Sequence, residues 1–512
     1  MKKNNNLLKA ILVCFLFCVL LTWLIPIGSI SEGNVTVSTI SPIGLFGLVY
    51  VPVITIATFV QYTLVIFGIG GFYGVLAKTG VYSKLVDKVA KKYDKKEKLF
   101  LIITIVTLMI LSSVLGNPYG LLVFVPFLIG IVLRLGYNKI TALATTIGAI
   151  LAGNVASTYG LSVGTQIANV LGTDVNNGIL PKFAFLVITI ALYVLFVCGN
   201  KKTKIEKPFE IVKETVEEVI VESVTENKKG KNKKVKEVVE RVVEKVIETK
   251  VFTYISIPFA DENEEGHKNE KPLVIILSLF AVVLFLSMTN WQYMFNVTLF
   301  DELFKKIGSI VIGDVPVIEK FLGIQSAFGY WTSYELAALL VIFSLLIGWV
   351  YGLKFDEILK AFVEGCKKIS KTAILMTLSC IVFTIMLMGS GSSVYVTITN
   401  LLLGLTKDFF FLTTAISGLF SGFFYNDFYY ALSSVAEIFQ TKYDAEFVNI
   451  FGFIFQTMHS IMMLILPTSV ILVGGLSILD ITIKDWFKYI LMFILQLLVL
   501  SIVISIGLVL MV

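Results

Sequence analysis

The chain has 512 residues, of which 56% are hydrophobic and 15% are charged, and its mean hydropathy is +0.87. These values exclude an ordinary soluble domain, whose core cannot absorb so many apolar runs of about 18 residues or more. The runs are continuous and do not alternate, which excludes a membrane β-barrel. The net charge of +6 comes from segregated lysine clusters. Such clusters suit the cytoplasmic face of a membrane and anionic lipid better than nucleic acid.

The first apolar segments set the expected orientation. Residues 1–9 carry three lysines and should lie inside. A span at about 10–26 follows, and a retained span is favoured over a cleaved signal because no A-x-A-like site comes after it. A second run, at about 50–78, leads to the lysine-rich segment 82–98, which is expected in the cytoplasm.

Two apolar stretches of about 16 residues then flank Gly116–Gly120. Each stretch is short for a full span, and both flanks are basic. A re-entrant hairpin at 99–135 fits these facts, and two very short spans are the alternative. The next apolar segment, 141–171, is interrupted by polar and small residues at 153–160 and is expected to be a broken helix.

After a span at about 183–198, residues 200–272 form a highly charged insertion that is expected in the cytoplasm. Pairs of valine or isoleucine recur about every four residues between 238 and 247, which favours one amphipathic helix. The β-branched content leaves a β-hairpin possible. A solvated linker and a regulatory or partner-docking segment are both open for its role.

The second half is expected to have similar parts. Residues 273–331 provide a linking span and an external amphipathic segment, and 332–512 provide a second repeat. This repeat contains a hairpin at 409–438 and a helix at 447–476 that is broken near Pro467. We therefore expect an all-α polytopic membrane protein with about nine transmembrane helices, two re-entrant hairpins and two broken helices. Residues 1–199 form the first transmembrane repeat.

Four small or polar features occur in the same order in residues 1–199 and 332–512, about 310 residues apart. The lysine distribution places the flanks of the first hairpin inside, and continuing the spans places those of the second hairpin outside. The same order of features in opposite orientation is typical of the inverted repeats of secondary transporters. We therefore expect an inverted-repeat transporter fold.

Asp427 is the most informative side chain in this pattern, because a carboxylate at membrane depth costs about 3 kcal/mol on insertion scales. A break in a helix also leaves backbone N–H and C=O groups unpaired. Such groups are tolerated in the membrane only where they line a protein cavity. We expect a substrate site between the hairpin tips and the helix breaks. Its expected members are Asn117, Asn154, Ser157, Thr158, Asn426, Thr468 and Ser469.

Two residues are candidates for ion or proton coupling. Asp427 is the stronger one. His459 precedes the second break and could relay protons, although a hydrogen-bonded packing role is the alternative. The five cysteines show no metal-ligand spacing, and no catalytic or Walker-type motif is present. We therefore expect neither an enzyme nor a metal site, and no cofactor apart from Na⁺ or H⁺ as the coupling ion.

Several motifs resemble those of the YfcC-like, C4-dicarboxylate anaerobic carrier group of the ion transporter superfamily, which includes the aminobenzoyl-glutamate transporters. They are Thr22-Trp-Leu-Ile-Pro-Ile-Gly28, Ile69-Gly-Gly-Phe-Tyr-Gly-Val-Leu-Ala-Lys-Thr-Gly80, Leu135-Gly-Tyr-Asn138 and Val163-Gly-Thr-Gln-Ile-Ala-Asn169. The resemblance implies a nine-span, two-hairpin protomer, commonly a homodimer, in which a mobile transport domain moves against a static scaffold. It also implies dicarboxylates, amino acids or related organic acids as substrates.

The chain departs from this group in two places. It has Asn117-Pro118 where relatives often carry acidic residues, and Ser157-Thr158-Tyr159-Gly160 where they often have Asn-Pro. The first departure leaves Asp427 as the main buried carboxylate, and the second leaves the substrate class open.

Together these patterns predict a secondary active transporter of the cytoplasmic membrane. It would move a small organic anion or amino-acid-type solute, coupled to Na⁺ or H⁺, by an elevator-type mechanism. The N-terminus and the insertion would be cytoplasmic. The alternative is a passive channel, or a membrane scaffold whose insertion docks a partner.

Overall fold

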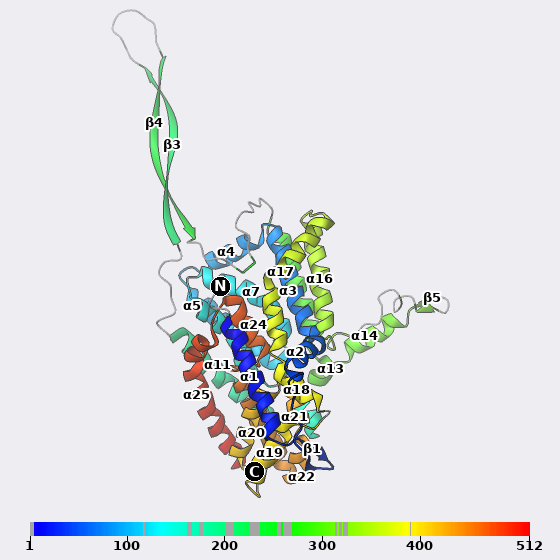
Figure 1. Cartoon of the computed structure of the whole chain (residues 1–512). Coiled ribbons are helices and arrows are strands. Elements are labelled where there is room, and N and C mark those ends of the chain that lie inside the picture. Colours follow the sequence, from blue (N-terminus) through cyan, green and yellow to red (C-terminus); the bar gives the residue numbers. More distant parts are fainter. Residues whose placement is uncertain are drawn as a thin grey trace, which may run out of the picture.

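The computed structural model is a bundle of helices that run between two ends (Figure 1). We call them the α4 end, which also holds α7, and the α19 end, which also holds α22. The structure describes the whole chain except residues 1–4, 116–117, 161–165, 174–177, 200–208, 226–235, 253–257, 260–268, 313–314, 317–319, 321–325, 390 and 512.

The first half is helical apart from one short β-hairpin near its start. A π-helical turn at Ala144–Gly148 joins α8 to α9, and a 3-10 turn at Leu122–Phe124 joins α6 to α7. Its elements are α1 (Asn5–Leu24), β1 (Gly28–Ser31), β2 (Asn34–Val37), α2 (Gly47–Thr58), α3 (Val60–Lys78), α4 (Tyr82–Lys92), α5 (Glu97–Leu115), α6 (Pro118–Leu121), α7 (Val125–Arg134), α8 (Lys139–Leu143), α9 (Ala149–Val155), α10 (Gln166–Leu171) and α11 (Ile179–Gly199).

The chain after the insertion is again mainly helical where the structure describes it, and it includes a small two-stranded sheet before α16. Its elements are α12 (Lys271–Met288), α13 (Trp291–Phe295), α14 (Leu299–Gly308), β5 (Val311–Ile312), β6 (Val315–Pro316), α16 (Ser333–Val350), α17 (Phe355–Leu378), α18 (Ile381–Met388), α19 (Val394–Gly404), α20 (Phe411–Phe424), α21 (Phe428–Ser433), α22 (Ala436–Lys442), α23 (Ala445–Met463), α24 (Val470–Leu479) and α25 (Ile483–Val509).

Eight helices among the described residues are long and apolar enough to cross a membrane. They include α5, which is one arm of the first hairpin. The broken helices contribute shorter apolar pieces, Lys139–Val155 before the first break and Val470–Leu479 after the second. The prediction of an all-α polytopic membrane fold is confirmed, and the repeat boundaries that we placed in the sequence stay predictions.

Both helix breaks are present. Helix α9 ends at Val155, and α10 begins only at Gln166. In the second half, α23 ends at Met463, and α24 begins at Val470 after Pro467. Proline removes a backbone donor and cannot continue a helix, which explains the second break. Neither segment is a continuous rod.

The two hairpins enter the bundle from opposite ends. Hairpin 1 (α5 to α7) has both feet at the α4 end, whereas hairpin 2 (α20 to α22) has both feet at the α19 end (Figure 1). Its second arm consists of the short helices α21 and α22. This opposite entry is the arrangement that an inverted repeat requires.

Helices α3 and α17 pack closely against each other. A Cβ atom added at Gly365 would lie 2.0 Å from the carbonyl oxygen of Gly70, and one added at Gly74 would lie 2.2 Å from the carbonyl oxygen of Ala361. Small residues let membrane helices approach until their backbones touch, and close packing then holds them together. We call this contact of Gly70 and Gly74 with Ala361 and Gly365 the glycine seam. Its close packing favours a rigid pair of helices.

The insertion differs from the expected helix. Strands β3 (Phe209–Thr225) and β4 (Lys236–Phe252) pair antiparallel as one long ribbon that projects from the α4 end (Figure 1). The amphipathic-helix interpretation was therefore wrong, and the alternative of a β-hairpin holds. β-Branched residues favour strands, and the register places Lys213 opposite Glu248.

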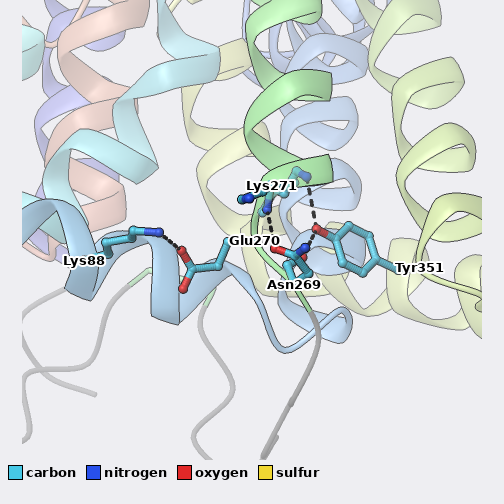
Figure 2. Close-up of polar contacts among 6 residues, drawn as sticks. Lys88, Asn269, Glu270, Lys271 and Tyr351 are labelled. Atoms are coloured by element: carbon cyan, nitrogen blue, oxygen red, sulfur yellow. Dashed lines mark hydrogen bonds and ion pairs between the residues drawn. The ribbon is translucent and has the colours of Figure 1, made fainter.

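The C-terminal side of the insertion is attached to the bundle. The Phe259 ring stacks on Tyr73 of α3 at 5.5 Å, and the Tyr82 hydroxyl of α4 donates to the Pro258 carbonyl. Figure 2 shows the next contacts, in which Lys88 of α4 forms an ion pair with Glu270, and the Tyr351 hydroxyl donates to the Asn269 carbonyl at 2.9 Å.

Candidate functional site

The first break is held by the end of hairpin arm α5. The Ser113 hydroxyl donates to the Ala156 carbonyl at 2.7 Å and accepts from the Thr158 amide at 3.1 Å. The Ser113 carbonyl oxygen lies 3.1 Å from the amides of both Thr158 and Gly160. Carbonyls in the last turn of a helix have no partner within it. Ser113 therefore links the end of α5 to the backbone of the first break by hydrogen bonds. Both segments would otherwise leave polar groups unpaired in the membrane.

Asn154 occupies the last turn of α9 beside the same hairpin arm. The Ser112 hydroxyl lies 2.6 Å from Asn154 Oδ1 and 2.7 Å from the Ile150 carbonyl oxygen. Gly153 makes this approach possible, because a Cβ atom there would lie 2.5 Å from the Met109 carbonyl oxygen. Ser157 and Thr158 are buried, and Asn154 is half-buried.

A residue of the second half completes this cluster. Gln456 lies on α23, and its Nε2 donates to the carbonyl oxygens of Asn154 at 2.8 Å and Val155 at 3.2 Å. These carbonyls end α9 and are freed by the break. The first break is therefore stabilised from the broken helix of the other half.

The second break packs on hairpin 2 in a similar way. The Thr468 hydroxyl donates to the Gly422 carbonyl at 3.2 Å, and the Ser421 hydroxyl lies 2.9 Å from His459 Nδ1. A Cβ atom on Gly422 would lie 2.9 Å from the His459 carbonyl oxygen. Ser469 is buried directly before α24, so it lies at the helix end whose free N–H groups attract anions.

Asp427 and Asn426 lie at the tip of hairpin 2. Asp427 is the N-cap of α21, and its Oδ1 accepts from the Tyr429 amide at 2.9 Å. Asn426 Nδ2 donates to the thiol sulfur of Cys380 at 2.8 Å, at the junction of α17 and α18. Within the described part of the chain, the buried Asn426 Oδ1 has no hydrogen-bond partner. This tip therefore presents an amide oxygen and a carboxylate.

A ladder of aromatic rings joins the two hairpin tips. Tyr119 of hairpin 1 stacks on Tyr62 of α3 at 4.8 Å, and Tyr62 stacks on Phe59 at 5.9 Å. Phe59 then contacts Phe383 of α18 at 5.2 Å, and Phe383 contacts Tyr425 of hairpin 2 at 5.4 Å. The tip of hairpin 1 therefore contacts α3, and the tip of hairpin 2 contacts α18 through the same row of rings.

The structure brings the predicted residues together in three neighbouring groups. Asn154, Ser157 and Thr158 share the first break, and His459 and Thr468 share the contact between hairpin 2 and the second broken helix. Asp427 and Asn426 lie on the α18 side, and the next residue, Phe428, contacts the His459 ring at 5.4 Å. Asn117 lies outside the described residues. The roles of all these residues stay predictions.

Sequence reasoning left out several residues that hold the site together. Ser113 is part of the polar segment at the end of α5, and that segment was the available signal. Gln456 stands three residues before His459 and carries a polar side chain on an apolar helix, which is the same kind of signal. No pattern in the sequence indicated that Tyr62 and Cys380 would meet the hairpin tips. Among the residues that the structure describes, no group of three His, Cys, Asp or Glu could hold a metal ion.

Comparison with curated proteins found no match. A solved structure that matches is the YdaH transporter of Alcanivorax borkumensis, whose topology is described as unusual. The alignment covers 99% of this chain and 98% of that chain, at 13% identity and a TM-score of 0.34, values too low to carry an argument.

The match to a family profile is the informative comparison. The profile of the C4-dicarboxylate anaerobic carrier family matches residues 8–510, which is nearly the whole chain. The resemblance in the sequence motifs is thereby confirmed. This chain belongs to the C4-dicarboxylate anaerobic carrier family and is a membrane transport protein.

Proposed function

We propose that this protein is a secondary active transporter that moves a small organic anion, of the C4-dicarboxylate or amino-acid type, coupled to Na⁺ or H⁺. The observation that carries the proposal is the meeting of two helix breaks and two oppositely entering hairpins, joined by the bonds from Gln456 to Asn154 and Val155. Sites of this kind bind solutes in ion-coupled carriers.

The chemistry of the site suits an anion. The Ser469 hydroxyl and the N-terminal end of α24 supply hydrogen-bond donors and a partial positive charge. The hydroxyls of Ser157, Thr158 and Thr468 donate to backbone carbonyls and reach a carboxylate by exchanging those bonds. These groups recognise carboxylates without a formal positive charge on the protein. The family description supports a C4-dicarboxylate as the first substrate to test.

Asp427 supports the coupling to a cation. A carboxylate substrate that approaches Asp427 in a low-dielectric site is repelled, because charges interact strongly there. A bound Na⁺ or a proton on Asp427 removes this repulsion. Substrate and cation therefore bind favourably together and poorly alone, and such mutual dependence is what couples their movement.

An elevator-type movement agrees with the packing. The glycine seam between α3 and α17 supplies a rigid scaffold, and the hairpins pack on the broken helices at Gly153 and Gly422 as one unit. The proposed carrier acts as a homodimer in the cytoplasmic membrane, with its N-terminus and insertion in the cytoplasm. The resemblance and the lysine distribution support this placement.

The test is uptake by purified protein in sealed proteoliposomes. Radiolabelled succinate is offered with an inward Na⁺ gradient, an inward proton gradient or no gradient. We expect saturable uptake that one of the gradients raises above equilibration, together with counterflow. Amino acids and monocarboxylates define the substrate class. Succinate uptake that neither gradient changes would refute the coupling, and non-saturable flux without counterflow would indicate a channel.

A further inference from the structure

An apolar cavity of about 390 Å³, open on one side, lies beside hairpin 1. Its walls come from α5, from the returning arm of the hairpin and from α12. Only two of its sixteen lining residues, Thr104 and Thr107, carry a polar side chain. Its size is that of a ligand pocket, but it lacks the polar groups that fix an anionic solute. The lining therefore suits a hydrophobic ligand better than the transported anion.

The position of the cavity identifies the medium around it. Both α5 and α12 are candidate membrane spans. The lining residues of α5 run from Phe100 to Leu115, which is about 22 Å at the usual rise per residue. One leaflet of the hydrocarbon core is about 15 Å deep. The cavity thus runs along the depth that lipid acyl chains occupy, and its mouth includes Ile103 and Phe285, which are exposed toward them.

Positive charge exceeds negative charge where α5 begins, since three lysines lie beside two acidic residues, Asp94 and Glu97. Lys95, Lys96 and Lys98 are exposed and precede Phe100, the first lining residue of α5. Lysines next to a membrane span attract anionic headgroups. We propose that one anionic phospholipid binds here, with an acyl chain in the cavity and its headgroup on these lysines.

The bound chain would stabilise the contact between hairpin 1 and α12. At the deep end of the cavity, Gly120 of the hairpin packs so closely on Met288 that a Cβ atom would lie 2.0 Å from the methionine sulfur. Nearer the α4 end, the rings of Phe124 and Phe280 still contact at 6.3 Å, and the cavity occupies the space beside them between α5, the hairpin arm and α12. An acyl chain fills this gap and holds the hairpin on α12, so the lipid favours the arrangement seen here.

The experiment measures lipid binding to the purified full-length protein by native mass spectrometry. Phosphatidylglycerol and phosphatidylcholine with the same 16- and 18-carbon chains are compared. Thr107→Trp places a bulky ring at the cavity mouth, and Ile110→Trp places one on the exposed face of the same helix outside the cavity. We expect wild type and Ile110→Trp to retain one phosphatidylglycerol and Thr107→Trp to lose it.

Two further measurements do not depend on the folding of Thr107→Trp. Shortening the acyl chains of phosphatidylglycerol by two methylenes should weaken binding to the wild-type protein, because a shorter chain leaves part of the cavity unfilled and loses packing contacts. Replacing Lys95, Lys96 and Lys98 by Gln should remove the preference for phosphatidylglycerol. The same change at Lys360, Lys367 and Lys371 should leave that preference intact.

Three results would overturn the proposal. The first is retention of phosphatidylglycerol by a folded Thr107→Trp protein. The second is binding that does not depend on chain length. The third is a disulfide between two copies through an introduced Ile103→Cys in the membrane, because a second protein chain would then cover the cavity mouth.

Discussion

Gln456 and Asn154 lie 302 residues apart, and the side-chain amide of the first donates to the backbone carbonyl of the second at 2.8 Å. The bond joins the broken helices of the two halves at the point where α9 ends. The membrane interior offers no water to such a carbonyl, so an unpaired one is costly. Gln456 therefore stabilises the break that forms one side of the proposed site.

Gln456→Leu should destabilise the protein by about 1–3 kcal/mol, because the carbonyls of Asn154 and Val155 lose their donor. We expect a lower thermal unfolding temperature in detergent and reduced uptake. Thr457→Val is the matched control, since the Thr457 hydroxyl is buried without a partner among the described residues. Equal unfolding temperatures for Gln456→Leu and wild type would contradict this role.

Ser113→Ala should lower stability by about 1–3 kcal/mol, because the Ala156 carbonyl and the Thr158 amide lose their hydroxyl partner. Ser344→Ala is the control, because among the described residues the buried Ser344 hydroxyl bonds only to Leu340 of its own helix. Thermal unfolding of both variants measures the difference. If the two changes cost the same, Ser113 has no special part in holding the first break.

Gly365→Ala should destabilise the protein by about 1–3 kcal/mol or prevent its folding, because the new methyl group overlaps the Gly70 carbonyl. Gly507→Ala on α25 is the control, since a Cβ atom there meets nothing within 4 Å. The yield of monodisperse protein and its unfolding temperature distinguish the two. A Gly365→Ala protein as stable as wild type would show that the glycine seam is not a rigid contact.

The membrane fold and the breaks could be predicted because lipid penalises polar groups severely. Asp427, the polar residues around Ser157 and the segment before Pro467 stand out against apolar sequence for this reason. The opposite entry of the hairpins followed from the lysine distribution and is seen in the structure. The hydrogen bonds between residues far apart in the sequence could not be predicted in the same way.

Two parts of the structure lay beyond the sequence pattern. The bonds of Gln456 arise from packing between α9 and α23, and no local pattern specifies a contact across 302 residues. The prediction of a helix in the insertion failed for a different reason. Valine pairs spaced by four fit one face of a helix, but β-branched residues also favour strands, and the pairing of β3 with β4 decided the outcome.

Asp427→Asn should abolish the response of uptake to the ion gradient while leaving the fold intact. Asn caps a helix about as well as Asp, so the bond to the Tyr429 amide persists and the unfolding temperature should not fall. The charge alone is removed. Asp444→Asn, before α23 on the exposed surface, is the control. Full gradient-driven uptake by Asp427→Asn would exclude this carboxylate from coupling.

Phe259→Ala should loosen the attachment of the insertion, because the stacking on Tyr73 is lost. Hydrogen–deuterium exchange at residues 269–273 should become faster, while exchange in α3 stays unchanged. Phe355→Ala removes an exposed ring and is the control. If exchange at 269–273 is the same as in wild type, the aromatic contact does not anchor the insertion.

The most direct test is whether both helix breaks line one substrate site. In a protein whose five cysteines have been replaced, single cysteines are introduced by Ser157→Cys, Thr468→Cys and, as a control, Ser344→Cys. The rate of reaction with a small thiol reagent is measured with and without the transported substrate. We predict that substrate slows the reaction at 157 and 468 and leaves 344 unchanged. Reaction rates at 157 and 468 that saturating substrate does not alter would contradict the account.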